Sequence, residues 1–446
     1  MSSTAISHFP VEIGIQIFNN ILYPDGSFSY SKFIRARWLV CRSSSEWMRA
    51  VNAYPKFWTH ISIDLETPSE LVDTYLNRAG SLPIKLCLDF HSIEQYFEVR
   101  RSVQTIQDLA TERMVIIQPL MHRVEQILME TEDRTLHDCM QEALRGLHAP
   151  LLRDIIVRFT HTRTKWDYGA LNSPSWTTGH LPALERVHLY RTLFPFPFAS
   201  ATLRELRIYE VPHERAFNFA DIRNIITGSP RLEELALWGI FCSEVQAGHI
   251  LSTSIHTLRI KFNHASVSRL AANFDFPLLR TVHVEIAHPS DVVCAVRCSQ
   301  LWKKVTHLKI NDNGRDVYNL PLLFDSFYSV THLDITECNG TLLSELTRHS
   351  GLNMSHETTT VFRELQSFKV AHATGRDVLQ FCLRHGAKDL SDGHHMKLRE
   401  VRMTIMVASH TECIEWMKEH IQSFRLYRMS NGMRVGADSE AARLTV

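Results

Sequence analysis

One apolar pattern recurs along most of this chain and constrains its fold more than any other feature. It is clearest between Pro230 and Trp238, where Leu232, Leu235 and Leu237 follow the order L-x-x-L-x-L. The same spacing recurs at Leu152/Ile155/Val157, Leu184/Val187/Leu189, Leu203/Leu206/Ile208, Ile255/Leu258/Ile260, Leu279/Val282/Val284, Val305/Leu308/Ile310, Val330/Leu333/Ile335, Leu365/Phe368/Val370 and Leu398/Val401/Met403. Successive copies start 19 to 35 residues apart. A unit of that length buries its apolar edge only against its neighbours, so the copies must stack.

A period of this size indicates a solenoid of the leucine-rich-repeat type, in which each repeat is a short strand followed by a helical return segment. The second and third apolar positions of each copy are two residues apart, so both point into the core and the residue between them points outward. We therefore expect an α/β fold: a short N-terminal helical domain followed by a curved leucine-rich-repeat solenoid with a parallel sheet on its concave face. The regular part of the array is expected to cover residues 150–404.

Composition narrows the class of protein further. At 446 residues the chain is too long for one compact core. The 48 Lys and Arg residues balance 48 Asp and Glu residues, which argues against a dedicated nucleic-acid binder. Nine cysteines are scattered singly, as in reduced proteins of the cytoplasm or nucleus. The N-terminus does not resemble a signal peptide, and there is no run of about 18 apolar residues, so we expect no contact with a membrane.

Residues 1–65 are expected to form a separate small helical domain. Pro10 suits the first turn of a helix, where its missing N–H would have no partner anyway. Ile13 and Ile17 then recur at helical spacing, and Phe18 widens the apolar stripe. Helices at 30–40 and 44–53 and a strand at 61–65 are expected to follow.

These positions together resemble the F-box-like domain found at the start of fungal F-box proteins. The resemblance rests on Phe9, Pro10, Ile13, Ile17, Phe18, Leu39, Val40, Trp47, Pro55 and Trp58. It implies that this region binds the small adaptor subunit of a cullin-RING ubiquitin ligase through those residues, and that the repeats select a protein substrate. The alternative is that Ile13, Ile17, Phe18 and Trp47 pack on one another and on the first repeat, as a purely structural cap.

Two further segments flank the regular array. Residues 66–150 are interpreted as degenerate repeats and transition helices. Residues 405–446 are interpreted as a C-terminal capping helix and tail. Within these segments we expect helices at 68–79, ended by Gly80, and at 92–112, 114–122, 137–146 and 411–424, and a strand at 84–88.

The chain carries no recognisable catalytic motif. It has no G-x-S-x-G, P-loop, H-E-x-x-H, paired C-x-x-C or dinucleotide-binding pattern. Cys294 and Cys298, with His283 and His288 nearby, have a spacing that could hold zinc, but burial on a return helix is the favoured interpretation. We therefore expect no enzyme activity from this chain alone, and no cofactor or metal.

The outward-pointing residues suggest a recognition surface. The residues between the last two apolar positions are Ile156, His188, Arg207, Ala236, Arg259, His283, Lys309, Asp334, Lys369 and Arg402, of which five are permanently basic. The next outward positions include Tyr190, Tyr209, Trp238 and Lys261. We hypothesise that an acidic or phosphorylated segment of a substrate binds Tyr190, Arg207, Tyr209, Trp238, Arg259, Lys261 and Lys309. The alternative is that these cations only keep an exposed sheet soluble.

Two functions are consistent with these patterns. The first is a non-catalytic substrate-recognition subunit of a cullin-RING ubiquitin ligase, with the cullin-ligase adaptor and a protein substrate as partners and no nucleic acid or membrane. The second is a leucine-rich-repeat scaffold that binds a partner protein and has no role in ubiquitin transfer.

Overall fold

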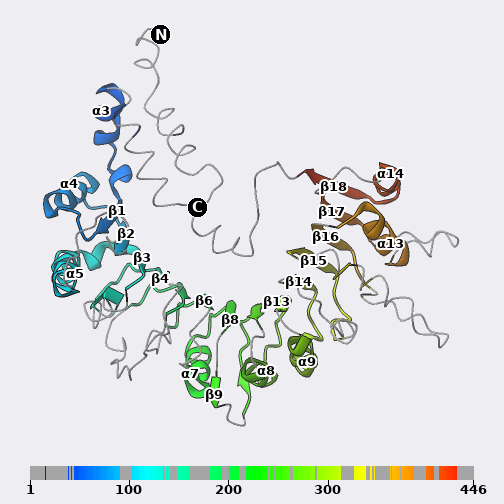
Figure 1. Ribbon diagram of the computed structural model, residues 1–446. Coiled ribbons are helices and arrows are strands. Elements are labelled where there is room, and N and C mark those ends of the chain that lie inside the picture. Colours follow the sequence, from blue (N-terminus) through cyan, green and yellow to red (C-terminus); the bar gives the residue numbers. More distant parts are fainter. Residues whose placement is uncertain are drawn as a thin grey trace, which may run out of the picture. The chain divides into compact units, whose positions relative to one another are not determined.

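The computed structural model describes most of the chain from residue 45 onward. The described ranges are 45–90, 103–133, 148–160, 181–192, 200–209, 217–239, 242–244, 248–261, 265–286, 289–312, 326–337, 364–371, 373–385, 398–405 and 411–428, with 16, 39, 42, 136, 137, 139, 140, 342, 343, 346 and 362. Their strands form an open 14-stranded sheet in the order β1-β2-β3-β4-β5-β6-β8-β11-β13-β14-β15-β16-β17-β18 (Figure 1). The predicted α/β class and parallel sheet are therefore confirmed. The chain divides into two compact units, with the boundary between Val187 and His188.

From residue 45 onward, a helix and a 3-10 turn of the first unit lead directly into the sheet. Its elements are α3 (Ser45–Ala53), η1 (Pro55–Trp58), β1 (His60–Asp64), α4 (Ser69–Ala79), β2 (Ile84–Phe90), α5 (Val103–Ile117), η3 (Gln118–Arg123), β3 (Val124–Thr131) and β4 (Asp154–Phe159). Strands β1 to β4 pair in parallel. Helix α4 ends as predicted at Gly80, whose φ of 60° is a left-handed conformation that glycine adopts without steric cost.

Strand β5 (Arg186–Tyr190) spans the boundary between the units. The sheet strands of the second unit are β6 (Glu205–Tyr209), β8 (Glu234–Trp238), β11 (Thr257–Lys261), β13 (Thr281–Ile286), β14 (His307–Asp312), β15 (His332–Glu337), β16 (Ser367–Ala371), β17 (Glu400–Ile405) and β18 (Ser423–Arg428). Between them lie the short strands β7 (Phe217–Asn218), β9 (Cys242–Glu244), β10 (Ile250–Leu251) and β12 (Phe274–Asp275), and the helices α7 (Phe219–Gly228), α8 (Ala265–Ala272), α9 (Pro289–Arg297), α10 (Ser299–Trp302), α13 (Gly375–His385) and α14 (Thr411–His420). Helices α7, α8, α9, α13 and α14 lie on the same face of these strands (Figure 1).

Each copy of the repeated apolar pattern lies in or just before one strand of the sheet, and its three apolar side chains are part of the hydrophobic core. Leu232, Leu235 and Leu237 are fully buried, and the equivalent side chains of the other copies are at most 2% exposed. Each such side chain contributes roughly 1.5 to 3 kcal/mol through burial. This core holds consecutive strands in register.

Backbone hydrogen bonds repeat with the same period. The Leu232 N–H donates to the Ser229 carbonyl and closes a turn ahead of β8, and the Leu279 N–H closes the matching turn to Phe276. One carbonyl of each repeat then accepts from two successive amides of the next, as the Arg204 carbonyl does from Glu233 and Glu234. The polar backbone at the start of each strand is thereby satisfied inside the array.

Two helix predictions were wrong at their ends. The helix predicted at 411–424 stops at His420, and Phe424 lies instead in β18, paired with β17. Residues 114–117 belong to α5, and the predicted helix there gives way to the 3-10 turn η3, because Pro119 has no N–H to continue an α-helix. Among the helices in the described part of the chain, none has the length and apolar character needed to cross a bilayer.

Candidate recognition surface on the sheet

The face of the second unit's sheet opposite its helices carries an ordered row of side chains. Parallel pairing aligns Arg207, Ala236, Arg259, His283, Lys309, Asp334, Lys369, Arg402 and Arg425, each with the next. We call these residues the central row. The register predicted from the repeated pattern is confirmed from Arg207 to Arg402. Arg425 was missed because residues 411–424 were predicted to form a closing helix, and no strand was expected to follow it.

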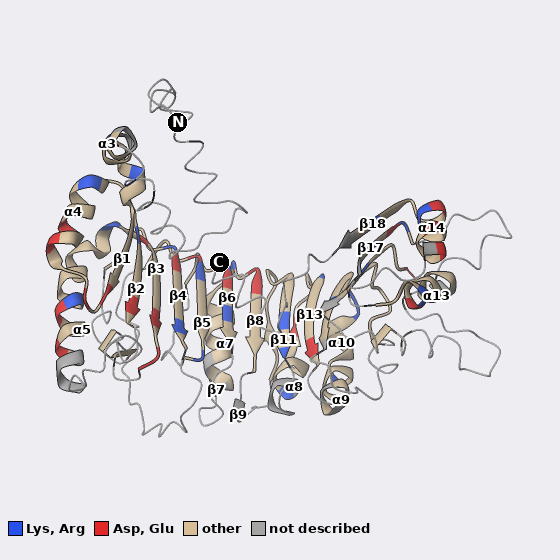
Figure 2. Ribbon diagram, turned by 45° about the horizontal axis from the view of Figure 1, so that its top comes forward, with Lys and Arg blue, Asp and Glu red and all other residues tan. Residues whose placement is uncertain are grey.

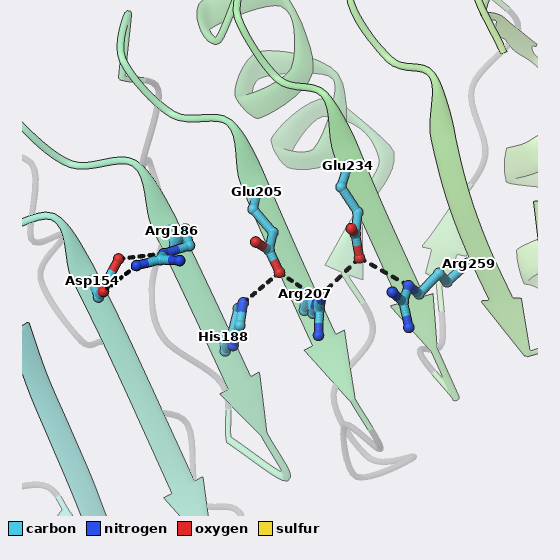
Figure 3. A network of polar contacts seen from close by, with 7 residues as sticks. All are labelled: Asp154, Arg186, His188, Glu205, Arg207, Glu234 and Arg259. Atoms are coloured by element: carbon cyan, nitrogen blue, oxygen red, sulfur yellow. Dashed lines mark hydrogen bonds and ion pairs between the residues drawn. The ribbon is translucent and has the colours of Figure 1, made fainter. Parts of the chain in front are cut away.

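Carboxylates from the preceding outward position neutralise the first arginines of the central row. Glu205 Oε1 lies 2.8 Å from His188 Nε2 and 2.5 Å from Arg207 Nε. Arg207 Nε also donates a hydrogen bond of 3.0 Å to Glu234 Oε1. Arg259 places its Nε 2.8 Å from that same oxygen, as a charge contact rather than an aligned hydrogen bond. These five residues form a carboxylate–arginine ladder across β5, β6, β8 and β11 (Figure 3).

The ladder is sheltered from solvent. The side chain of Arg207 is 16% exposed, and those of Glu205, Glu234 and Arg259 are each 19% exposed. Burial acts to lower the pKa of Arg207, but Tyr209, Glu234 and Glu205 together outweigh it and raise that pKa above its usual value. Arg207 is therefore a permanently charged group that is already satisfied by its own strand and the next.

The cations on which the substrate hypothesis rests are consequently balanced by carboxylates in this stretch. Lys261, the next cation on β11, has its Nζ 2.5 Å from Glu285 Oε1 on β13. Acidic and basic positions lie close together on β6, β8 and β11 (Figure 2). The balancing carboxylates stand two residues before the central row at Glu205 and Glu234, and two residues after it at Glu285.

An aromatic cluster lies beside the ladder, as the sequence suggested. The rings of Tyr190 and Tyr209 stack with centroids 4.6 Å apart, and the Trp238 ring follows at 5.8 Å from Tyr209. Tyr209 and Trp238 pack with Ala236 and are nearly buried, while Tyr190 is half-buried. The aromatic residues predicted to bind substrate are thus brought together, but most of their surface is used within the sheet.

His283 extends this cluster on β13. Its ring lies edge-on to Trp238 with centroids 5.1 Å apart, and its side chain is buried. Burial lowers the pKa of His283 well below its usual value, and the positive charges of Lys309 and Arg259 lower it further. The imidazole is therefore neutral at physiological pH. Lys309, the last predicted substrate contact, is half-buried in the central row.

The last three cations of the central row are in a different environment. We call Lys369, Arg402 and Arg425 the C-terminal basic row; they lie on β16, β17 and β18 in register. The side chains of Lys369 and Arg402 are 39% and 34% exposed, and Arg425 is exposed. These cations are roughly twice as accessible as those of the ladder.

The structure places four of the predicted adaptor-binding residues. Pro55 starts η1 and is exposed, and Leu39 is 55% exposed. Trp47 lies in α3. Trp58 is buried: its indole donates a 2.9 Å hydrogen bond to the Val51 carbonyl, and its ring stacks on Tyr75. The remaining six, Phe9, Pro10, Ile13, Ile17, Phe18 and Val40, lie outside the described residues.

Metal chemistry finds no support in the described part of the chain. No group of three His, Cys, Asp or Glu side chains is close enough there to hold an ion. Cys294 lies in α9 and Cys298 directly after it, and both are buried; burial raises the pKa of Cys298 to about 12. Such a thiol stays protonated and is a poor metal ligand. His288 lies outside the described residues.

Comparison with known proteins adds no family. No family model matches the chain, and no curated protein matches it. Function must therefore be argued from the geometry above and from the residue patterns.

Proposed function

We propose that this chain is a non-catalytic substrate-recognition subunit of a cullin-RING ubiquitin ligase of the F-box type. Its first 65 residues, an F-box-like domain, bind the ligase adaptor. The strands that follow form a leucine-rich-repeat solenoid, whose open sheet face binds a protein substrate. Other subunits transfer ubiquitin, and this chain supplies proximity by raising the effective concentration of the substrate at the ligase. Such a subunit works in the cytoplasm or nucleus.

The observation that carries the proposal is the in-register stacking of the repeated pattern. It leaves equivalent positions of successive repeats aligned on one sheet face, where most repeats present a polar or aromatic side chain. An extended surface of this kind suits recognition of another protein rather than a small substrate in a pocket. The attachment to a ligase rests on the resemblance of residues 9–58 to F-box-like domains.

The buried Trp58 refines the adaptor surface. Because the indole contacts α3 and α4, its part in the proposal is to fix the junction between the N-terminal helices and the sheet. The exposed Leu39 and the apolar stripe of Ile13, Ile17 and Phe18 then provide the adaptor contact.

Co-purification with the adaptor tests the proposal. The wild-type chain should bring down the adaptor when the two are expressed together, and Ile17→Asp with Phe18→Asp should abolish this by placing charges in an apolar interface. A matched control is Val293→Asp with Leu383→Asp, which changes two partly exposed apolar residues of α9 and α13 in the same way. Absence of adaptor with the wild-type chain, or equal loss in the control, would overturn the ligase role.

One sequence feature favours a second function, a leucine-rich-repeat scaffold without a ligase. F-box-like domains usually place a cysteine about one helical turn before the tryptophan, whereas here Cys41 precedes Trp47 by six residues. A shifted helix would lose the adaptor and keep the sheet face. In that case the wild-type chain yields a protein partner but no adaptor in the same experiment.

A further inference from the structure

We propose that the C-terminal basic row, Lys369, Arg402 and Arg425, is the binding site for an acidic segment of the partner protein. This inference rests on the protein-binding half of the proposed function and does not depend on the adaptor. It assigns recognition of acidic side chains to this row and not to Arg207, Arg259 and Lys261.

Register brings the three cations together on one face. Lys369 pairs with Arg402 across β16 and β17, and Arg402 pairs with Arg425 across β17 and β18. Neighbouring strands lie about 4.8 Å apart, so the row spans roughly 10 Å. Among the described strands β18 is the last in the sheet.

The carboxylates near this row are too few to neutralise its three cations. Lys369 Nζ is 3.9 Å from Asp334 Oδ2, at the limit of an ion pair. Arg402 binds Glu400 through Nε and Nη2, and the Ser367 hydroxyl donates to the same carboxylate. Among the described residues no carboxylate lies within ion-pair distance of Arg425. Three cations therefore face two carboxylates.

The ladder and the neighbouring Lys261 together contain as many cations but lack these properties. There, Arg207, Arg259 and Lys261 are enclosed by Glu205, Glu234 and Glu285. A ligand carboxylate would have to displace an internal one from a mostly buried position, which gains nothing in charge pairing. At the C-terminal basic row a ligand can use guanidinium and ammonium donors that still face solvent.

The dimensions favour a short acidic peptide over a nucleic acid. An extended peptide rises about 3.3 Å per residue, so roughly three to four residues cover the row, with two or more acidic side chains among them. A nucleic-acid site typically neutralises about 6 to 10 phosphates and needs a broader basic footprint.

The test is the binding of a fluorescein-labelled octapeptide of alternating Glu and Ser to the full chain, followed by fluorescence anisotropy. We expect binding that weakens with salt, and little binding of the matching Gln–Ser peptide. Arg402→Glu with Arg425→Glu should weaken binding about tenfold or more. The neutral pair Arg402→Gln with Arg425→Gln should weaken peptide binding to a smaller extent. This pair still tests the contribution of the two positive charges if the charge reversal disturbs the folding of β18.

The matched control is Arg376→Glu with Lys418→Glu, which makes the same change of net charge at exposed positions of α13 and α14. Its affinity should stay within about twofold of wild type, because the mutated side chains are on helices away from the row. Equal loss in the control, or equal binding of the Gln–Ser peptide, would overturn the proposal. Tighter binding of a single-stranded DNA octamer would reassign the row to nucleic acid. None of these results depends on the adaptor.

Discussion

At the scale of single residues, two neighbouring glutamates of the second unit differ in how far their ion pairs are buried. Glu234 contacts both Arg207 and Arg259 in a sheltered position, while Glu233 is 45% exposed and lies 3.5 Å from Arg204. Breaking a buried ion pair leaves an uncompensated charge, whereas an exposed pair contributes little.

Glu234→Gln should therefore lower the free energy of unfolding by about 3 kcal/mol, measured by urea denaturation. Glu233→Gln is the control and should change it by less than about 0.5 kcal/mol. Equal effects of the two substitutions would show that the ladder is not an energetic unit.

His283 predicts a pH dependence of stability. Burial, together with the charges of Lys309 and Arg259, lowers the pKa of His283 in the folded chain. As the pH falls through about 6.5, the unfolded chain therefore binds a proton at this residue and the folded chain does not. Stability is thus full above this pH and falls as the pH drops below it, by up to about 1.4 kcal/mol per pH unit.

His283→Phe keeps a ring against Trp238 and cannot titrate. Thermal unfolding followed from neutral to mildly acidic pH should lose part of its pH dependence in this variant. An unchanged slope would show that His283 does not carry the effect.

The repeated apolar pattern predicts individual strands well, because its three apolar side chains are all buried only when the segment forms a strand in this register. Strands β4 to β17 of the sheet follow it, and their register follows from it. Strand β18 was missed because Phe424 fits two periods: it is four residues after His420 on a helix, and it is also the middle residue of Ile421-x-x-Phe424-x-Leu426.

The site was harder to predict than the fold. Rows of outward residues were placed correctly, but their charge balance depends on positions two residues away, such as Glu205 and Glu234. Which cations are sheltered depends on the carboxylates that adjacent strands place beside them, as Glu234 of β8 does for Arg207 and Arg259. The local sequence of a repeat does not contain that information.

At the scale of elements, β18 is the last of the described sheet strands, and its core side chains should contribute less to stability than those of an interior strand. Leu237 in β8 is fully buried, whereas the equivalent Leu426 is only half-buried. Leu237→Ala should cost about 3 kcal/mol in unfolding free energy and Leu426→Ala about 1 kcal/mol. Equal costs would mean that β18 is covered as completely as an interior strand.

At the scale of the whole molecule, we propose two tasks for two regions of one chain. Residues 1–65 are proposed to bind a ligase adaptor, and the sheet face near β16 to β18 is proposed to bind an acidic segment of a substrate. Neither task needs a catalytic group in this chain. The two should therefore be separable by mutation.

The most direct test is to measure both activities on the same purified proteins, with adaptor binding by size-exclusion chromatography and octapeptide binding by anisotropy. Ile17→Asp with Phe18→Asp should abolish adaptor binding and leave peptide affinity within about twofold of wild type. Arg402→Glu with Arg425→Glu should do the reverse. Failure of the wild-type chain to bind the adaptor, or loss of both activities from either pair of substitutions in a folded protein, would contradict the account.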